Sequence, residues 1–244
     1  LHLEENETIT AFISVNEFSD SEYLFMTTKK GIVKKTTLSA FSHFKNRPII
    51  AINLDENDTL KWVHKTTGEK DIVLVTSRGM VIRFNESQVR SMGRSSRGVK
   101  GIKIKPEDSL ISMSTIQTES EIEHLLILTL KGYGKNMKLA EFKCQARGGI
   151  GVKSIKFRKT VKGDLLKDAC IVTKDQEIMI ITQNGTMCRQ QISAISTQRR
   201  ESQGVRIVKL DDKDNVISMS PVIKEDEVEN ETIEITPEQI KPSE

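Results

Sequence analysis

A glycine turn that recurs four times is the feature that most limits what this chain can fold into. The turn glycines are Gly31, Gly79, Gly132 and Gly185, so successive copies are 48, 53 and 53 residues apart. Each glycine lies between two strand-like runs and is followed within a few positions by a basic residue. A repeat of this length with strand patterning is typical of a bladed or arrayed β-architecture. Because every copy carries positive charge at the same phase, we expect each unit to contact one long polyanionic partner in turn.

The basic residues fall into two groups. Those on the strand after the glycine turn are Lys34, Lys35, Arg83, Lys135, Lys138 and Arg189. Those in a Gly/Arg-rich loop further on are Arg94, Arg97, Lys100, Arg147, Lys153, Arg199, Arg200 and Arg206. Glycine permits close backbone approach and unusual φ angles, so that N–H groups can meet phosphates, and arginine adds bidentate contacts. The alternative is that these glycines only serve tight turns and the arginines only solubilise a loop; three loops at one phase favour phosphate binding.

A second repeated phrase marks where the units meet. Residues 3–9, 54–60, 104–110 and 210–216 each consist of five mostly acidic or turn-forming residues between two apolar ones. This pattern predicts a strand, a polar turn and the next strand. It places the repeats at about 9–59, 60–109, 110–165 and 166–216, each with an opening strand such as 9–15, and makes residues 1–8 the end of an upstream blade of a larger array. The third unit has no clean copy, and 159–164 predicts a longer excursion there.

The apolar strands are short and rich in Ile, Val and Leu, which predicts an all-β fold. Only the short segments after the basic strands, such as 38–41, favour a helical turn. We therefore expect one domain over residues 9–223, followed by a tail.

That tail, residues 224–244, differs in charge from the rest of the chain. It holds eight acidic and two basic residues, a net charge of −6, whereas the whole chain has +3, which leaves +9 for the body. An acidic tail beside a basic body is common among nucleic-acid binders, where it competes for the basic surface. A disordered, solvated terminus with no regulatory role is an equal alternative.

Sites for catalysis or metal binding are not predicted. The four histidines lie apart without paired-ligand spacing, and the nucleophile, nucleotide and zinc motifs are not found. Cys144, Cys170 and Cys188 have neither disulfide nor zinc spacing, so free thiols are expected. Because these motifs are missing, the chain is expected to be non-catalytic. It has no apolar run long enough to span a bilayer and no signal-peptide pattern at Leu1, so it is expected to be cytoplasmic and without a membrane partner.

The partner that fits this pattern best is duplex DNA held by its backbone. Aromatic residues make up only 5% of the chain and do not interleave with the basic loops, so stacking platforms for single strands are scarce. A propeller-like scaffold for an acidic protein is the alternative from another class. Such a scaffold is expected to expose aromatic hot spots, whereas this repeat offers Arg, Lys and glycine.

The phrases at 31–36, 79–84, 132–135 and 203–207 make the chain similar to the C-terminal domain of the DNA gyrase A protein, a component of a type II topoisomerase. The resemblance implies a β-pinwheel, a propeller-like disc of four-stranded blades whose basic edge bends duplex DNA. It implies a non-catalytic, wrapping role in ATP-dependent negative supercoiling, with ATP and Mg used elsewhere and no cofactor in this chain. The implied partners are the rest of the gyrase A protein and the gyrase B protein, in an A2B2 heterotetramer.

Two departures from the family pattern matter. The family disc usually has six blades, and four repeats are visible here. The family box Q-R-R-G-G-K-G, which belongs to the first blade, is not intact; a close relative in the third unit reads Gln145, Ala146, Arg147, Gly148, Gly149, Ile150, Gly151. The C-terminal domain of the corresponding topoisomerase IV protein, with degenerate repeats, is the nearest alternative. The family's active-site tyrosine lies in another domain, so neither Tyr23 nor Tyr133 inherits that role.

Overall fold

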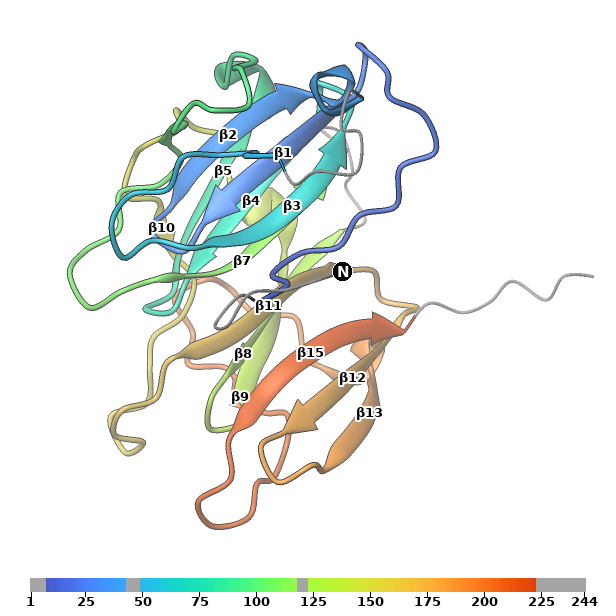
Figure 1. Ribbon diagram of the computed structural model, residues 1–244. Coiled ribbons are helices and arrows are strands. Elements are labelled where there is room, and N and C mark those ends of the chain that lie inside the picture. Colours follow the sequence, from blue (N-terminus) through green and yellow to red (C-terminus); the bar gives the residue numbers. More distant parts are fainter. Residues whose placement is uncertain (1–7, 43–48, 118–122, 223–244) are drawn as a thin grey trace, which may run out of the picture.

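Four antiparallel sheets follow one another along the chain (Figure 1), in a computed structural model that describes residues 8–42, 49–117 and 123–222. The first sheet has the order β3 (Leu60–Thr66), β1 (Tyr23–Thr28), β2 (Ile32–Thr37), β6 (Val99–Lys100). The second has the order β7 (Leu110–Ile116), β4 (Asp71–Thr76), β5 (Met80–Asn85), β10 (Val152–Lys153). The all-β prediction is confirmed.

The other two sheets repeat the plan. The third has the order β11 (Leu166–Val172), β8 (His124–Thr129), β9 (Tyr133–Lys138), β14 (Val205–Arg206). The fourth consists of β15 (Val216–Val222), β12 (Glu177–Thr182), β13 (Met187–Gln191). Short 3-10 turns follow the basic strands, as expected: η1 (Leu38–Phe41), η2 (Glu86–Gln88), η3 (Leu139–Glu141), η4 (Ile192–Ala194).

The sheets divide the chain differently from the predicted repeats. The strands predicted to open units at 60, 110 and 166 instead complete the preceding sheet: β3 pairs with β1, β7 with β4, and β11 with β8. The expected strand at 9–15 is absent from the described residues 8–20. In the copies at 54–60, 104–110 and 210–216 the predicted turn and the strand after it are observed, but the residues before the turn are not in a strand. Pairing partners depend on tertiary contacts that periodicity does not reveal. The predictions for residues 1–7 and for the tail from 224 fall outside the described residues.

Each two-residue strand is donated to a sheet by the next repeat. Val99 and Lys100 pair with the start of β2, Val152 and Lys153 with the start of β5, and Val205 and Arg206 with the start of β9. The loop before each donated strand also bonds to that sheet: the amides of Met92, Gln145 and Gln198 donate to the carbonyls of Lys35, Arg83 and Asn136. Every described Gly/Arg-rich loop thus lies on the sheet of the repeat before its own.

The seven-residue strands and the donated strands occupy opposite edges of the sheets. β7 lies beside both β3 and β11, and β11 lies beside β15, so these strands form one edge of the array. Apolar clusters join neighbouring sheets; one of them unites Val73 and Val75 of β4 with Leu125 and Ile127 of β8. We call the opposite edge, formed by β6, β10, β14 and the loops 90–98, 143–151 and 198–204, the rim.

An aspartate fixes each glycine turn, and in three of the four turns it belongs to the second repeated phrase. The backbone N–H before the glycine donates to an Asp Oδ1 at 3.0 to 3.1 Å, in the pairs Lys30–Asp58, Arg78–Asp108, Lys131–Asp164 and Asn184–Asp214. Asp164 lies at the end of the excursion predicted at 159–164. The third unit therefore keeps the turn contact although its phrase is lengthened.

Candidate nucleic-acid interface

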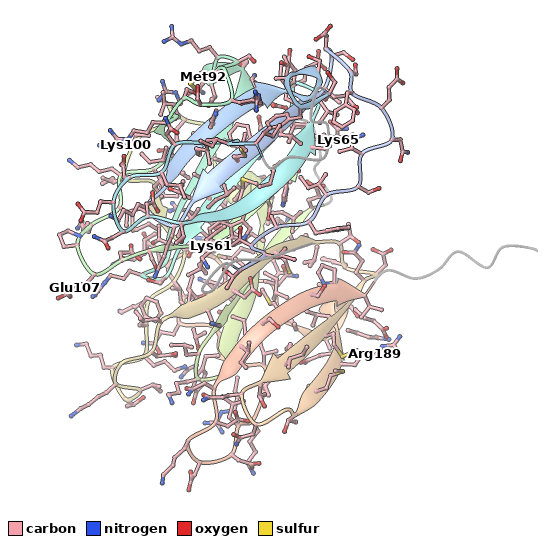
Figure 2. The ribbon with its side chains drawn as sticks, viewed as in Figure 1. Lys61, Lys65, Met92, Lys100, Glu107 and Arg189 are labelled. Carbon is pink, nitrogen blue, oxygen red and sulfur yellow. The ribbon has the colours of Figure 1, made fainter. Side chains whose placement is uncertain are left out.

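The donated strands place three cations on the outermost positions of the rim. Lys100 of β6, Lys153 of β10 and Arg206 of β14 are exposed, and Figure 2 shows Lys100 at the periphery of the first sheet. Successive members are 53 residues apart, so each occupies the same place on its sheet. The structure thus brings together in one row three residues that the sequence predicted.

A second row of cations was missed in the sequence. Lys103, Lys156 and Lys209 each follow a residue of the first row by three positions, and all three are exposed. The signal was present in the phrases that read Val, a cation, two residues and Lys. These lysines lie beyond the glycine-rich part of each loop, so the loop pattern alone does not include them.

Two predicted lysines are buried, which corrects the expectation that they line an exposed surface. Lys135 is fully buried, and its Nζ donates to the carbonyls of Arg199 and Arg200 at 2.7 and 2.6 Å and to Ser202. Lys34 is equally buried, and its Nζ donates to the carbonyls of Ala51 and Arg94. Burial lowers the pKa of each lysine to about 8. Their ammonium groups hold the rim loops and do not face a ligand.

Three more predicted cations, Lys35, Arg83 and Arg189, differ in burial, and the first two are largely buried. Lys35 is buried, donates to the Glu86 carbonyl at 3.1 Å and lies 5.0 Å from the centre of the Tyr23 ring. Arg83 is mostly buried and pairs with Asp71 at 2.8 Å. Lys35 is held by a carbonyl and an aromatic ring, and Arg83 by a largely buried ion pair. These two residues therefore do not form the exposed row that was expected.

Arg189, the third, occupies the corresponding place on β13, where it is paired with Glu177 but remains exposed. Figure 2 shows it at the periphery of the fourth sheet. Lys138 and Arg199 are exposed, and Arg97 is exposed but paired with Asp55. These four side chains are accessible, and their predicted contact with DNA stays a prediction.

Arg94, Arg147 and Arg200 stand at equal phase in the three loops and are only half exposed. Arg147 donates from Nε to the Gln88 carbonyl at 2.9 Å and from Nη1 to the Lys100 carbonyl at 3.1 Å. Arg200 donates from Nη1 to the Lys153 carbonyl at 3.3 Å. Each of these two guanidinium groups therefore donates a hydrogen bond to a backbone carbonyl of a neighbouring rim strand.

The segment 145–151, similar to the family box, follows the sheet surface closely. The glycine N–H groups were expected to meet phosphates. The Gly148 N–H instead donates to the Gly101 carbonyl at 2.6 Å, so this amide is not available for a phosphate. Gly148 and Gly151 have φ of 79° and 73°, and the Gly149 carbonyl accepts from the Lys103 N–H. The glycines in this segment do have unusual φ angles and do allow close backbone approach, as predicted. The backbone that they approach is that of the protein itself.

Arg206 is fixed by an aromatic ring. Its guanidinium lies 5.2 Å from the centre of the Tyr133 ring and donates to the Tyr133 hydroxyl at 2.7 Å, while Arg158 lies 4.8 Å from the same ring centre. Cation–π contacts of this kind orient a guanidinium without neutralising its charge. Arg206 thus presents its charge at a defined place on the rim.

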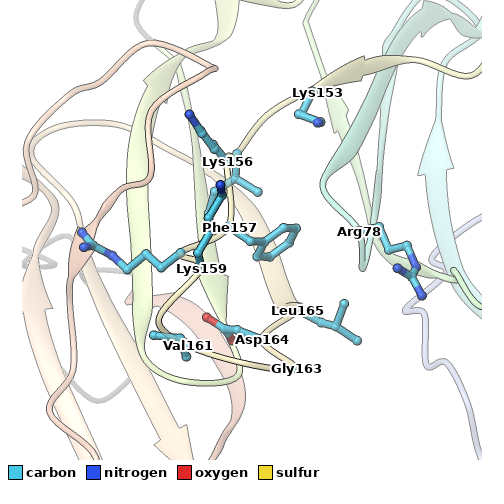
Figure 3. A pocket seen from close by; sticks show the side chains of 11 residues that line it. Arg78, Lys153, Lys156, Phe157, Lys159, Val161, Gly163, Asp164 and Leu165 are labelled. Carbon is cyan, nitrogen blue, oxygen red and sulfur yellow. The ribbon is translucent and has the colours of Figure 1, made fainter.

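A shallow hollow of about 550 Å³ lies between the second and third sheets. Its lining includes Arg78, Lys153, Lys156 and Lys159, with Asp164 as its one acidic residue (Figure 3). The lysines come from β10 and the segment after it. The hollow extends the positive surface of the rim from one sheet to the next.

Other chemistry is not indicated by the described residues. Within 8–42, 49–117 and 123–222, no group of three His, Cys, Asp or Glu side chains could hold a metal ion, and no helix could cross a membrane. The three cysteines are free, as predicted. His64 and His124 are packed among other side chains, and burial lowers the pKa of both.

Comparisons with known proteins agree with this architecture. The family model described as "DNA gyrase C-terminal domain, beta-propeller" matches residues 22–67, 70–117, 123–166 and 176–223. The chain is 35% identical to the DNA gyrase A protein of Synechocystis sp., with 91% of the chain and 29% of the relative covered. It is 38% identical to the DNA gyrase A protein of Staphylococcus epidermidis, with 93% and 25% covered. The chain therefore spans between a quarter and a third of the length of these relatives.

Two solved structures share the fold. The C-terminal domain of DNA topoisomerase IV has a TM-score of 0.84 and 28% identity, over 90% of this chain and 68% of that one. The DNA gyrase A C-terminal domain has a TM-score of 0.75 and 25% identity, over 86% and 68%. Each of the four matched segments contains the two strands that flank the glycine turn of one sheet. The chain belongs to the DNA gyrase C-terminal domain family.

Proposed function

We propose that this chain binds duplex DNA by its phosphate backbone and bends it around the rim, without catalysing a reaction itself. The observation that carries the proposal is the double row of exposed cations, Lys100, Lys153 and Arg206 with Lys103, Lys156 and Lys209. They recur at one place on three successive sheets, as the contacts of a curved, regular polyanion must. Backbone contacts of this kind give affinity without reading sequence.

The wider role follows from the family. We propose that the domain presents a wrapped DNA segment to the remainder of the gyrase A protein and to the gyrase B protein, in an A2B2 enzyme that uses ATP and Mg elsewhere to introduce negative supercoils. The cytoplasm, at the nucleoid, is the corresponding location. The C-terminal domain of topoisomerase IV remains the second candidate because its solved structure is so similar in fold; both candidates share the DNA-binding role.

Energy transfer between dyes at the two ends of a duplex tests the proposal. A duplex of about 40 base pairs is far shorter than the persistence length of DNA, so its ends approach only if the protein bends it. With six phosphate contacts or more, affinity should fall roughly 10³-fold or more between about 50 and about 200 mM salt. A rise in transfer with this steep salt dependence would support a bending rim. If the chain does not bind the duplex even at low salt, the proposal is wrong and the acidic-protein scaffold becomes the better interpretation.

A further inference from the structure

The predicted rim cations divide into those that face solvent and those that tie neighbouring sheets together. The second kind includes Arg147 and Arg200, which we call the latch arginines. We propose that the latch arginines set the curvature of the rim by joining successive sheets, and that they are positioning residues which do not contact phosphate. This inference rests on the proposed DNA-bending function.

The first junction lies between the first and second sheets. Arg147 belongs to the loop that covers the second sheet, whereas Lys100 belongs to β6 at the edge of the first. The Arg147 fork reaches the carbonyls of both Lys100 and Gln88, and the Gln88 side chain in turn accepts the Arg147 N–H at 2.9 Å. Arg147 donates to these two carbonyls from two different nitrogens, Nε and Nη1, of one rigid planar group. The single ammonium nitrogen of a lysine at this position does not have this fork geometry.

The second junction repeats this arrangement one unit later. Arg200 lies on the loop that covers the third sheet and donates to the carbonyl of Lys153, in β10 of the second sheet. Glu141 stands 53 residues after Gln88 and accepts the Arg200 N–H at 3.1 Å, as Gln88 does for Arg147. A side-chain contact that recurs with the period of the repeat is a property of the junction and not an accident of one loop.

Backbone hydrogen bonds accompany each latch. At the first junction, Gly148 donates to the Gly101 carbonyl and Lys103 donates to the Gly149 carbonyl at 2.8 Å. At the second, Lys156 donates to the Ser202 carbonyl at 3.1 Å. All of these bonds lie at the rim, whereas the apolar clusters that join the sheets include residues of the central strands and of the opposite edge, such as those of β7. Two sheets held at both edges have a fixed angle between them.

The accepted carbonyls belong to Lys100 and Lys153, two residues of the outer row. Each latch therefore fixes the backbone of a residue whose side chain faces solvent. A loosened latch would change where successive cations lie relative to one another, while their number and charge would remain. The expected consequence is a change in the DNA path without loss of phosphate contacts.

The double variant Arg147→Lys and Arg200→Lys tests this because it keeps both charges. Arg199→Lys is the matched control: it adjoins Arg200 and is exposed, and no contact of its guanidinium with the described residues is observed. In the free protein, we expect hydrogen exchange at the amides of Lys103, Gly148 and Lys156 to accelerate about tenfold in the double variant and to stay unchanged in the control. Intact apolar clusters should keep the double variant folded, which its circular dichroism would verify.

With the end-labelled duplex, we expect the double variant to bind with an unchanged salt slope and to give less energy transfer at saturation. An Arg147→Ala and Arg200→Ala variant separates the roles further: a slope smaller by about 1.8 would mean that both arginines contact phosphates, and would overturn the inference. Unchanged exchange would equally overturn the latch, and unchanged transfer on bound DNA would overturn its role in curvature. If the wild-type chain fails to bind DNA, the proposed function fails, and the exchange measurement still decides whether the latch exists.

Discussion

Lysine at one position of the repeat is buried where positive charge is costly. Lys34 and Lys135 follow their turn glycine by three residues, and the same position holds Ile82 and Cys188 in the other units. An ammonium is tolerated there because it donates to carbonyls, among them those of Arg94, Arg199 and Arg200 in the overlying loops. These bonds offset part of the lost hydration. In the first and third sheets, therefore, the loop that carries the rim arginines is held by a buried ammonium group. Ile82 is buried at this position of the second sheet, and Cys188 is partly exposed at this position of the fourth.

Replacing Lys135 by Met should lower the free energy of unfolding by about 1 to 3 kcal/mol, because carbonyls that accept its hydrogen bonds lose their donor. The loss should depend on pH. Burial lowers the pKa of Lys135 from 10.5 to about 8, so between these values the folded protein has released a proton that the unfolded chain still holds. The free energy of unfolding of the wild type therefore rises with pH in that window, and that of the variant does not show this rise.

Urea unfolding of both proteins at about pH 7.5 and about pH 10 measures this effect. The difference between wild type and Lys135→Met should be larger at the higher pH. Lys138→Gln, at an exposed position of the same strand, is the control and should change stability by less than about 0.5 kcal/mol. An equal difference at both pH values would show that the pKa of Lys135 is not lowered.

At the scale of the element, each donated strand depends on the glycine before it. Gly98, Gly151 and Gly204 have φ of 97°, 73° and 74°. A Cβ at these positions would lie 2.5 to 2.6 Å from a carbonyl oxygen of β2, β5 and β9, respectively. Because those oxygens belong to the strand that receives the donated pair, the glycine lets the two backbones meet closely.

Gly151→Ala should therefore destabilise the protein by about 2 kcal/mol or more, since the alanine would meet both a positive φ and a backbone oxygen. It should also weaken the pairing of β10 with β5. Gly93→Ala is the matched control: Gly93 lies in another rim loop, has no atom within 4 Å of an added Cβ, and is not at positive φ. Thermal unfolding of the two variants compares them, and equal midpoints would contradict the role assigned to Gly151.

At the scale of the whole molecule, strand donation makes the rim continuous. A loop from one repeat covers the sheet of the repeat before it, so the exposed cations of three repeats follow one another along one edge. Each of these sheets should then contribute alike to DNA binding. These cations are not expected to read base sequence, because contacts to phosphates carry no sequence information.

Lys100→Gln and Lys153→Gln should each lower the slope of log affinity against log salt by about 0.9, and the double variant by about 1.8. The loss should be the same for duplexes of unrelated sequence, because phosphate contacts do not distinguish bases. Titrations at several salt concentrations with two unrelated duplexes measure it. A large loss with one sequence only would contradict backbone binding.

Much of this molecule follows from local sequence. The turns at Gly31 and Gly79 require a residue at positive φ, and flanking apolar residues alternate or run together as strands do, so the repeat, the all-β class and the position of the basic loops were predictable. The row that begins at Lys100 was predictable as well, and Lys103 carried a signal that was missed. These properties depend on residues close together in the chain.

What only the tertiary structure decided is which neighbour each element meets. Lys135 was predicted to be exposed, and it is buried because a loop more than 60 residues further along the chain covers it. Arg147 was predicted to contact a phosphate, and the structure adds that its guanidinium donates to the carbonyl of Lys100 in another sheet. Strand donation, which causes both outcomes, leaves no mark in the periodicity. The sequence determined where charge and turns occur, while long-range pairing determined which charges remain free, because burial depends on contacts between residues distant in the chain.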